Sequence, residues 1–189
     1  MVGVLMKHNK DVYDFIYKIY ENDKCVLSFL LPHVESVAEL AVRLAEKHGA
    51  DVDFVCRASL LHDIGVFMTN ATKIGCRGIS PYMQHGVFGK ILLESYGFTR
   101  EATVALTHVG AGITAKHIIE NSLPLPPIDM VPKTLEEEIV SYVDLFFSKR
   151  PDKLTVPKTV EEVSSDVKRY GDDSYKVFEK WHRKFGDLQ

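Results

Sequence analysis

Imidazole and carboxylate side chains fall on the apolar faces of several separate helical segments of this sequence. His33 shares one face with Val37 and Leu44, and Asp144 lies in line with Phe147 on another. Spacings of three and four residues, or their sums, place side chains on one side of a helix. A buried carboxylate is costly unless it is paired or bound to a metal, and no Lys or Arg shares the face of Asp144. We therefore expect the helices to converge so that these polar groups bind cations together: His33, His62, Asp63, His85, His108 and Asp144.

Each member of this set also has an ordinary explanation when it is taken alone. A single His on an apolar face is most often a hydrogen-bonded core residue, Asp63 can cap a helix end, and Asp144 can belong to a buried ion pair. The joint pattern is harder to explain in that way. Nitrogen and oxygen ligands without thiolate suit Fe, Mn, Zn, Co or Ni. Because neighbours on a helix diverge by about 100°, His62 and Asp63 can hold two different metals, or one metal if the carboxylate swings in from the helix end.

Helical spacing of apolar residues runs through nearly the whole chain, and no convincing strand pair is present in the sequence. We predict an all-α fold, a bundle of about six to eight helices around a buried metal site. Pro32 is expected to open one helix, Asp53 to cap the next, and Thr134 with Glu137 to form a capping box. The predicted helical ranges are 11–21, 32–48, 53–64, 81–96, 99–109, 114–121, 134–149 and 172–185, with a further helix capped by Thr159.

The chain has 189 residues and is expected to form one domain, or one domain with an appendage. The best candidate for a boundary is Arg150-Pro151-Asp152, after which the sequence is richer in charge and poorer in apolar residues. We predict a metal-binding helical domain over residues 1–150 and a helical extension over 151–189. Phe178, Trp181 and Phe185 share one face of the extension, which either covers the core or forms the contact of a homodimer.

Composition excludes several classes of protein. Lys and Arg number 23 against 26 Asp and Glu, a net charge of −3, so we expect neither a duplex nucleic acid nor an anionic membrane as partner. The three cysteines form no C-x-x-C pair, which suits a reducing compartment and argues against a disulfide framework or a thiolate zinc site. Residues 1–10 do not have the pattern of a signal peptide, and no run of about 18 apolar residues predicts a membrane span. We expect a cytoplasmic protein.

The stretch Ala58-Ser59-Leu60-Leu61-His62-Asp63-Ile64-Gly65 resembles the signature of the HD-domain superfamily of metal-dependent phosphohydrolases. His33 is similar to the family's first ligand and Asp144, in Ser-Tyr-Val-Asp, to its last, so the likeness spans roughly residues 26–149. His85 and His108 fall between them. The resulting order H…HD…H…H…D resembles the subgroup with two metals, which includes cyclic-dinucleotide phosphodiesterases, diadenosine-polyphosphate hydrolases and mixed-valent diiron oxygenases.

The resemblance implies a role for each ligand. His33, His62, Asp63 and Asp144 would bind a first divalent metal ion. His85 and His108 would bind a second, with Asp63 bridging the two, and family likeness favours Fe or Mn. Asp63 and His62 would be catalytic, and a water that bridges the cations would lose its proton and attack phosphorus. The expected substrate is a small phosphate ester such as a nucleotide.

One departure from the family pattern concerns the phosphate. Many hydrolytic members carry a basic residue directly after the His-Asp-Ile-Gly stretch, where this chain has Val66. We therefore expect Arg77 or Lys73, in the long segment 66–80, to bind the phosphate, with Lys116 as a weaker candidate.

Two other functions are compatible with the same ligands. A diiron oxygenase would use an identical ligand set and would be recognised by its consumption of dioxygen. A non-catalytic sensor or scaffold, stabilised by metal, would hydrolyse no phosphate ester. The ligand residues alone do not separate these alternatives from a phosphohydrolase.

Overall fold

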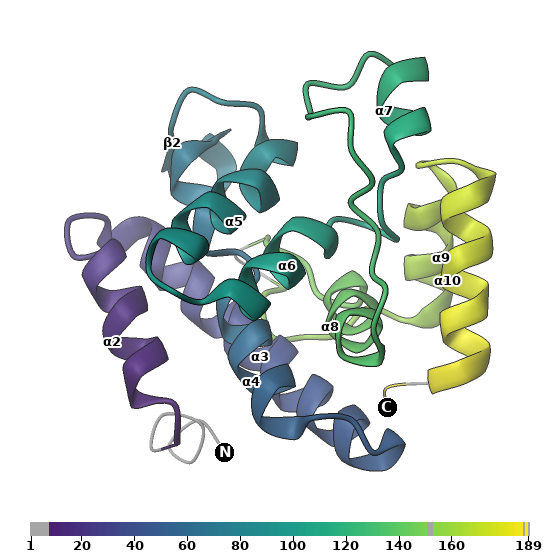
Figure 1. The fold of residues 1–189 in the computed structure, drawn as a ribbon, viewed down its shortest axis with the longest axis horizontal. Helices are drawn as coiled ribbons and strands as arrows, with labels where there is room; N and C mark the ends of the chain where they lie inside the picture. Colours follow the sequence, from purple (N-terminus) through teal and green to yellow (C-terminus); the bar gives the residue numbers. More distant parts are fainter. Residues whose placement is uncertain (1–7, 151–152, 187, 189) are drawn as a thin grey trace.

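The computed structural model describes residues 8–150, 153–186 and 188, and apart from one short hairpin the regular secondary structure within them is helical (Figure 1). This confirms the predicted all-α class. The α-helices are α2 (Lys10–Ile19), α3 (Lys24–His48), α4 (Val52–Leu61), α5 (His85–Ser95), α6 (Thr99–Thr107), α7 (Ala115–Glu120), α8 (Leu135–Leu145), α9 (Val160–Lys168) and α10 (Asp172–Phe185). The 3-10 helices are η1 (Ile64–Met68), η2 (Thr72–Ile74) and η3 (Tyr82–Gln84), and the strands are β1 (Asn70–Ala71) and β2 (Cys76–Arg77).

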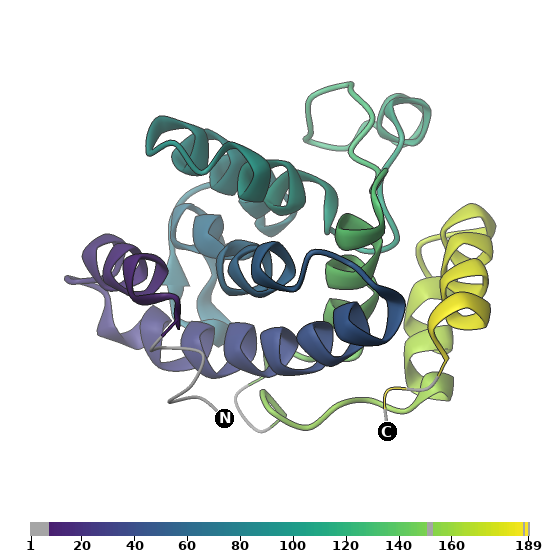
Figure 2. The ribbon, with the colours of Figure 1, turned by 60° about the horizontal axis from the view of Figure 1, so that its bottom comes forward.

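Helix α4 lies at the centre of the bundle. Figure 2 shows it with the long helix α3 on one side, α5 and α6 on the opposite side, and α8 next to it. Its residues Val55, Ala58 and Leu61 are fully buried, as expected for a helix with neighbours all round. The central place of α4 matters because the His62-Asp63 pair follows directly after its last residue.

Helix α3 is longer than the sequence pattern predicts. It begins at Lys24, where the Asp23 side chain accepts a hydrogen bond from the Val26 amide, so the prediction that Pro32 opens this helix is wrong. Pro32 instead lies inside the helix, where its ring removes one backbone donor. Packing of the buried residues Val26 and Leu30 outweighs that loss.

Two predicted caps can be compared directly with the structure. Asp51, not Asp53, caps α4 by accepting a hydrogen bond from the Phe54 amide, so the helix begins at Val52. The capping box of Thr159 and Glu162 at the start of α9 is present with both of its hydrogen bonds. For α4, Asp51 and Asp53 are equally good capping residues, and the local sequence does not show which of them is used.

The segment that follows α4 forms η1, the antiparallel hairpin of β1 and β2, and η3. In this hairpin Asn70 pairs with Arg77 and Ala71 with Cys76, so the prediction of no strand pair is wrong for these short strands. Each strand has two residues, too few for an alternating pattern to be visible in the sequence.

Helix α8 begins after Thr134, which accepts a hydrogen bond from the Glu137 amide. This is one half of the predicted capping box; the Glu137 side chain accepts from the Lys133 amide instead of the Thr134 amide. The helix ends at Leu145 instead of near Lys149. The carbonyls at its end are satisfied from a distant segment. The Lys158 side chain donates to the Leu145 carbonyl and the Lys158 amide to the Phe146 carbonyl. Residues 147–150 are therefore not helical.

Helix α10 packs against α8 and α9. Phe178, Trp181 and Phe185 are buried in the same apolar cluster as Tyr142, whose hydroxyl donates to the Gly186 carbonyl at 2.7 Å. Pro151 and Asp152, where the sequence predicts a boundary, lie outside the described residues, and the division into two domains stays a prediction.

Among the described residues, one helix, Lys24–His48, is long and apolar enough to cross a membrane by length and composition alone, a property it shares with core helices of soluble proteins. Of its most apolar stretch, 44% is buried inside the molecule. Its buried face packs on α4 and α8.

Candidate metal centre

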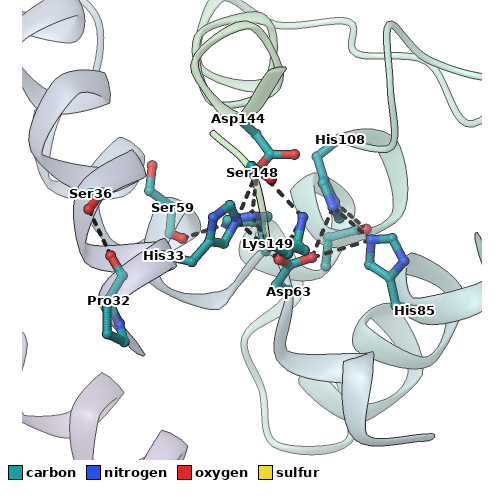
Figure 3. A network of polar contacts seen from close by, with 12 residues as sticks. Pro32, His33, Ser36, Ser59, Asp63, His85, His108, Asp144, Ser148 and Lys149 are labelled. Carbon is teal, nitrogen blue, oxygen red and sulfur yellow. Dashed lines mark hydrogen bonds and ion pairs between the residues drawn. The ribbon is translucent and has the colours of Figure 1, made fainter. Parts of the chain in front are cut away.

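The six side chains predicted as ligands meet in one place in the interior, and Figure 3 labels five of them, all but His62. His33 comes from within α3, His62 and Asp63 from the end of α4, and Asp144 from the last turn of α8. His85 is the first residue of α5, and His108 follows α6. All six are buried, with exposed fractions between 0% and 9%. The convergence predicted from helical spacing is thus present in the structure.

Asp63 lies at the middle of the cluster and presents its two oxygens to two different groups. Its Oδ2 is 3.2 Å from Nε2 of His33 and 3.4 Å from Nε2 of His62, and both nitrogens also lie within 3.4 Å of Asp144 Oδ1. Its Oδ1 is 3.3 Å from Nε2 of His85 and 3.4 Å from Nε2 of His108. One carboxylate therefore joins two adjacent sets of ligands.

Three of the four imidazoles are held in a defined orientation. Nδ1 of His62, His85 and His108 lies 2.7 to 2.9 Å from the backbone carbonyl of the residue three positions earlier. A carbonyl only accepts, so Nδ1 carries the proton and donates it. In the neutral ring the lone pair is then on Nε2, which faces the cluster. Orientation of a ligand imidazole through its second nitrogen is typical of metal sites.

His85 and His108 face each other in an arrangement that a cation would relieve. Their Nε2 atoms are 3.0 Å apart. Burial lowers the pKa of His85 to about 3 and also lowers the pKa of His108, so both rings are neutral near pH 7. Two lone pairs then point at each other. A metal ion between the rings would turn this repulsion into two coordinate bonds.

The other half of the cluster is rich in charge. Burial disfavours the charged forms of Asp63 and Asp144, but Lys149 and His62 outweigh this and hold the pKa of each carboxyl well below its usual range. The two carboxylates in turn overcome the effect of burial on His62 and raise its pKa to about 10. Two negative and two positive groups thus balance each other here.

Lys149 is a member of the cluster that sequence reasoning missed. Its Nζ lies 2.9 Å from Asp63 Oδ2 and 3.7 Å from Asp144 Oδ1, and its side chain is only 18% exposed. Asp144 thus has a cationic neighbour, although no Lys or Arg shares its helical face. Lys149 does not share the helical face of Asp144; it reaches the site because α8 ends at Leu145 and the following chain turns inward.

Buried polar atoms without hydrogen-bond partners test whether a metal fits. Among the described residues, such atoms gather at this cluster: Nε2 of His33 and of His62, both oxygens of Asp63, and Oδ1 of Asp144. Buried polar atoms are nearly always satisfied in folded proteins. Ligand atoms of His33, His62 and Asp144 lie within 4.8 Å of one another, as do those of His62, Asp63 and His108. The donor set therefore fits divalent cations.

Close backbone packing sets the distance between Asp63 and the second pair of histidines. Gly65 lies against α5 so tightly that a Cβ there would be 2.3 Å from the His85 carbonyl oxygen and from the Gly89 amide. The Tyr20 hydroxyl donates to the Ile64 carbonyl at 2.7 Å and holds the same turn from the other side. The Gly of the His-Asp-Ile-Gly stretch is thus required by the approach of α5.

A cavity of about 520 Å³ borders the cluster. Lys149 belongs to both, and Tyr82, which also lines the cavity, has its ring 4.8 Å from that of His85. The Tyr82 hydroxyl is buried and has no hydrogen-bond partner among the described residues. Basic side chains line this cavity, and none of its described lining residues carries a carboxylate: Lys73, Lys149, Arg150 and Lys158.

The three cations expected to bind phosphate have different positions. Lys73 lines the cavity. Arg77 is exposed on β2 and is not among the described lining residues. Lys116 is 80% exposed on α7, where it lies 3.8 Å from Glu120. Val66, at the position where a basic residue was expected by likeness, is fully buried in the core. Sequence reasoning missed Tyr82, three positions before His85, and Lys149, five positions after Asp144.

The fold and the cluster define a helical metal-binding protein of the His-Asp type. The sequence profile of the HD domain matches residues 30–147, and the chain belongs to this family. The HD domain of the Listeria monocytogenes phosphodiesterase PgpH has a similar structure, with a TM-score of 0.51 over 88% of this chain and 93% of that one. At 16% identity this likeness shows the shared fold.

Three curated relatives are closer in sequence. An uncharacterized protein of Methanocaldococcus jannaschii is 38% identical over 72% of this chain and 76% of its own length. Two proteins named tRNA (cytidine(56)-2'-O)-methyltransferase, from Thermoplasma volcanium and Picrophilus torridus, are 37% and 31% identical over 71% and 75% of this chain. The chain spans only 35% and 39% of the lengths of these two proteins.

Proposed function

We propose that this protein is a metal-dependent phosphohydrolase with two divalent cations, which hydrolyses a small phosphate ester such as a nucleotide. One observation carries the proposal: a cluster of six buried side chains, with Asp63 at its centre, lies beside a cavity with basic walls. Membership of the HD domain family supports the metal-dependent activity in general.

The ligands divide into two groups around Asp63. His33, His62 and Asp144 with Asp63 Oδ2 would hold one cation, and His85 and His108 with Asp63 Oδ1 the other. When bound, such a cation pair supplies Lewis acidity and a water activated for attack on phosphorus. The imidazoles of His62, His85 and His108 are kept in place by their carbonyl partners, so little reorganisation is needed on binding.

The cavity supports an anionic substrate of moderate size. Its volume is in the range of small-molecule sites, roughly 300–1,000 Å³. Its walls combine the ammonium groups of Lys73 and Lys158 with the ring of Phe147 and the hydroxyl of Tyr82. A phosphate would face the cations and the Tyr82 hydroxyl, and an apolar or aromatic part of the substrate would contact Phe147. A nucleoside monophosphate has this combination of groups.

The proposal is tested by loading the metal-free protein anaerobically with Mn²⁺ or Fe²⁺ and measuring phosphate release from a panel of nucleotides and other phosphate esters. We expect turnover that is lost in His33→Gln and Asp63→Asn variants. Failure of every metal-loaded preparation to cleave any ester would contradict a hydrolase and favour the scaffold alternative. Dioxygen uptake with a mixed-valent iron spectrum would instead favour a diiron oxygenase.

Methyl transfer to tRNA is the activity in the names of the two longer relatives. We do not propose it here, because the buried polar groups of this chain are arranged as cation ligands. As partner we propose a small phosphorylated molecule, and as compartment the cytoplasm.

A further inference from the structure

Lys149 occupies a position that conflicts with a filled metal centre. Its ammonium is 2.9 Å from Asp63 Oδ2, the same oxygen that lies 3.2 Å from His33 Nε2 and 3.4 Å from His62 Nε2 (Figure 3). It also lies 3.7 Å from Asp144 Oδ1. A divalent cation held by these ligands would share both carboxylates with the ammonium. Two cations in a buried space repel each other strongly, because little water screens them.

The chain around Lys149 gives its side chain a second place to go. Residues 147–150 lie beyond the end of α8 and form no helix, so no helical hydrogen bonds fix the backbone of Lys149. The side chain has a flexible stem of four carbons, and the residue also lines the cavity. No carboxylate is found among the described lining residues of that cavity. An ammonium that leaves Asp63 in this direction meets no carboxylate among the described residues that line the cavity.

We propose that Lys149 is an exchangeable counter-ion: it neutralises the two carboxylates in the metal-free protein, is displaced by the divalent cation, and then binds the substrate phosphate in the cavity. This inference rests on the proposed function for the identity of the anion, and on the contacts of Lys149 for the exchange itself. It assigns the phosphate contact to Lys149, in place of Arg77 or Lys116. It also couples the two binding events, because substrate finds its cationic partner only after the metal has bound.

The exchange is tested first by metal binding. Mn²⁺ titration by calorimetry is compared for the native protein, Lys149→Met, and the matched control Lys73→Met, which removes a cation from the same cavity without touching Asp63. Lys149→Met removes the competitor, so we expect Mn²⁺ affinity to rise by about tenfold or more. Lys73→Met should leave it unchanged. Equal or weaker Mn²⁺ binding by Lys149→Met, compared with the control, would overturn the proposal.

A second readout uses the native protein and so does not depend on the folding of a variant. The amine of Lys149 is labelled with an acylating reagent, and the extent of modification is measured by mass spectrometry. We expect labelling to increase when Mn²⁺ is added and to decrease again when inorganic phosphate is added. Labelling that does not respond to Mn²⁺ would show that Lys149 stays on Asp63, and would also overturn the proposal.

These outcomes are distinguishable from a failure of the proposed function. If Mn²⁺ exposes Lys149 and phosphate protects it, the exchange holds even when the loaded protein hydrolyses no ester tested. If phosphate esters are hydrolysed but neither Mn²⁺ affinity nor labelling depends on Lys149, the hydrolase stands and the exchange is wrong. Phosphate affinity of the Mn²⁺-loaded protein should fall in Lys149→Met and be restored in part in Lys149→Arg.

Discussion

At the scale of single residues, the site combines groups that have partners with groups that have none. The Nδ1 atoms of His62, His85 and His108 are satisfied by backbone carbonyls. Apart from the ion-pair contact of Lys149 with Asp63, the cluster-facing atoms of His33, Asp63 and Asp144 have no hydrogen-bond partner among the described residues. Such unsatisfied atoms are costly in a folded protein unless a ligand uses them. These atoms therefore mark the side chains that a bound ligand would contact.

Tyr82 allows a prediction at this scale. Its hydroxyl is buried at the cavity and has no partner among the described residues, so Tyr82→Phe removes no internal hydrogen bond. We expect the unfolding free energy to change by less than about 0.5 kcal/mol, and the KM for a phosphate ester to rise roughly five- to tenfold, the worth of about one hydrogen bond. Steady-state kinetics and urea unfolding measure the two effects. A large loss of stability with an unchanged KM would assign the hydroxyl a structural role.

At the scale of elements, the contact between η1 and α5 positions one half of the candidate metal centre and not the other. Gly65 permits the close approach that brings His85 to Asp63, while His33 and Asp144 come from α3 and α8 on the other side. A disturbance of the η1–α5 contact should therefore affect one set of ligands and leave the other in place.

Gly65→Ala tests this separation. A Cβ at this position would be 2.3 Å from the His85 carbonyl oxygen, so α5 must shift away, at a cost of about 1–3 kcal/mol for overpacking. We expect the variant to retain one metal equivalent and to lose the second. Gly89→Ala on the same interface is the control, because its Cβ would approach no atom more closely than the Ala105 Cβ at 3.2 Å. Metal analysis of both variants measures the effect; retention of two equivalents by Gly65→Ala would contradict it.

The attachment of α10 to α8 gives a prediction that depends on pH. Glu138 Oε2 lies 2.6 Å from Lys184 Nζ, and this partner outweighs burial and lowers the pKa of the carboxyl below its ordinary 4.5. A lowered pKa in the folded state contributes stability above the unfolded pKa, and this contribution is lost as the pH falls through the folded value. We expect Glu138→Gln to cost about 0.5–1 kcal/mol at pH 7.

The difference between native protein and Glu138→Gln should shrink as the pH falls below about 4.5, the region in which Glu138 becomes protonated in the unfolded chain. Urea unfolding at a series of pH values measures it. A difference that stays constant down to pH 3 would show that the side chain acts through packing and not through its charge.

The elements also show how far the sequence could be interpreted without a structure. Helical spacing predicted that the six side chains converge, because a residue's place on a helix face depends only on its near neighbours in the chain. The end of α8 depends on Lys158, which contacts the carbonyls of Leu145 and Phe146 from a distant segment. The approach of Lys149 to Asp63 follows from that end, and so local pattern could not predict it. The start of α3 was missed for a similar reason, since tertiary packing tolerates Pro32 inside the helix.

At the scale of the whole molecule, ligands for one centre come from α3, α4, α5, α6 and α8, which are separate in the chain. A metal ion that binds side chains from these elements stabilises the folded state relative to the unfolded one, in which the side chains are far apart. Stability and metal binding are therefore linked in this protein.

Thermal unfolding tests the linkage. At a free Mn²⁺ concentration of about 100 times Kd, one bound ion adds roughly 2.7 kcal/mol. For a chain of this size each kcal/mol raises Tm by roughly 2–4 °C. We expect Mn²⁺ to raise Tm by about 5–10 °C in the native protein and by much less in His33→Gln. An equal rise in both proteins would assign the stabilisation to ions bound elsewhere.

In the proposed metal centre, six buried side chains hold two divalent cations, and Asp63 contacts both. Anomalous X-ray diffraction from crystals of the Mn²⁺-loaded protein measures this most directly. We expect two peaks, one among His33, His62 and Asp144 and one between His85 and His108, each next to a different oxygen of Asp63. Diffraction that shows no ion in the cluster, with Lys149 still on Asp63 at saturating Mn²⁺, would contradict it.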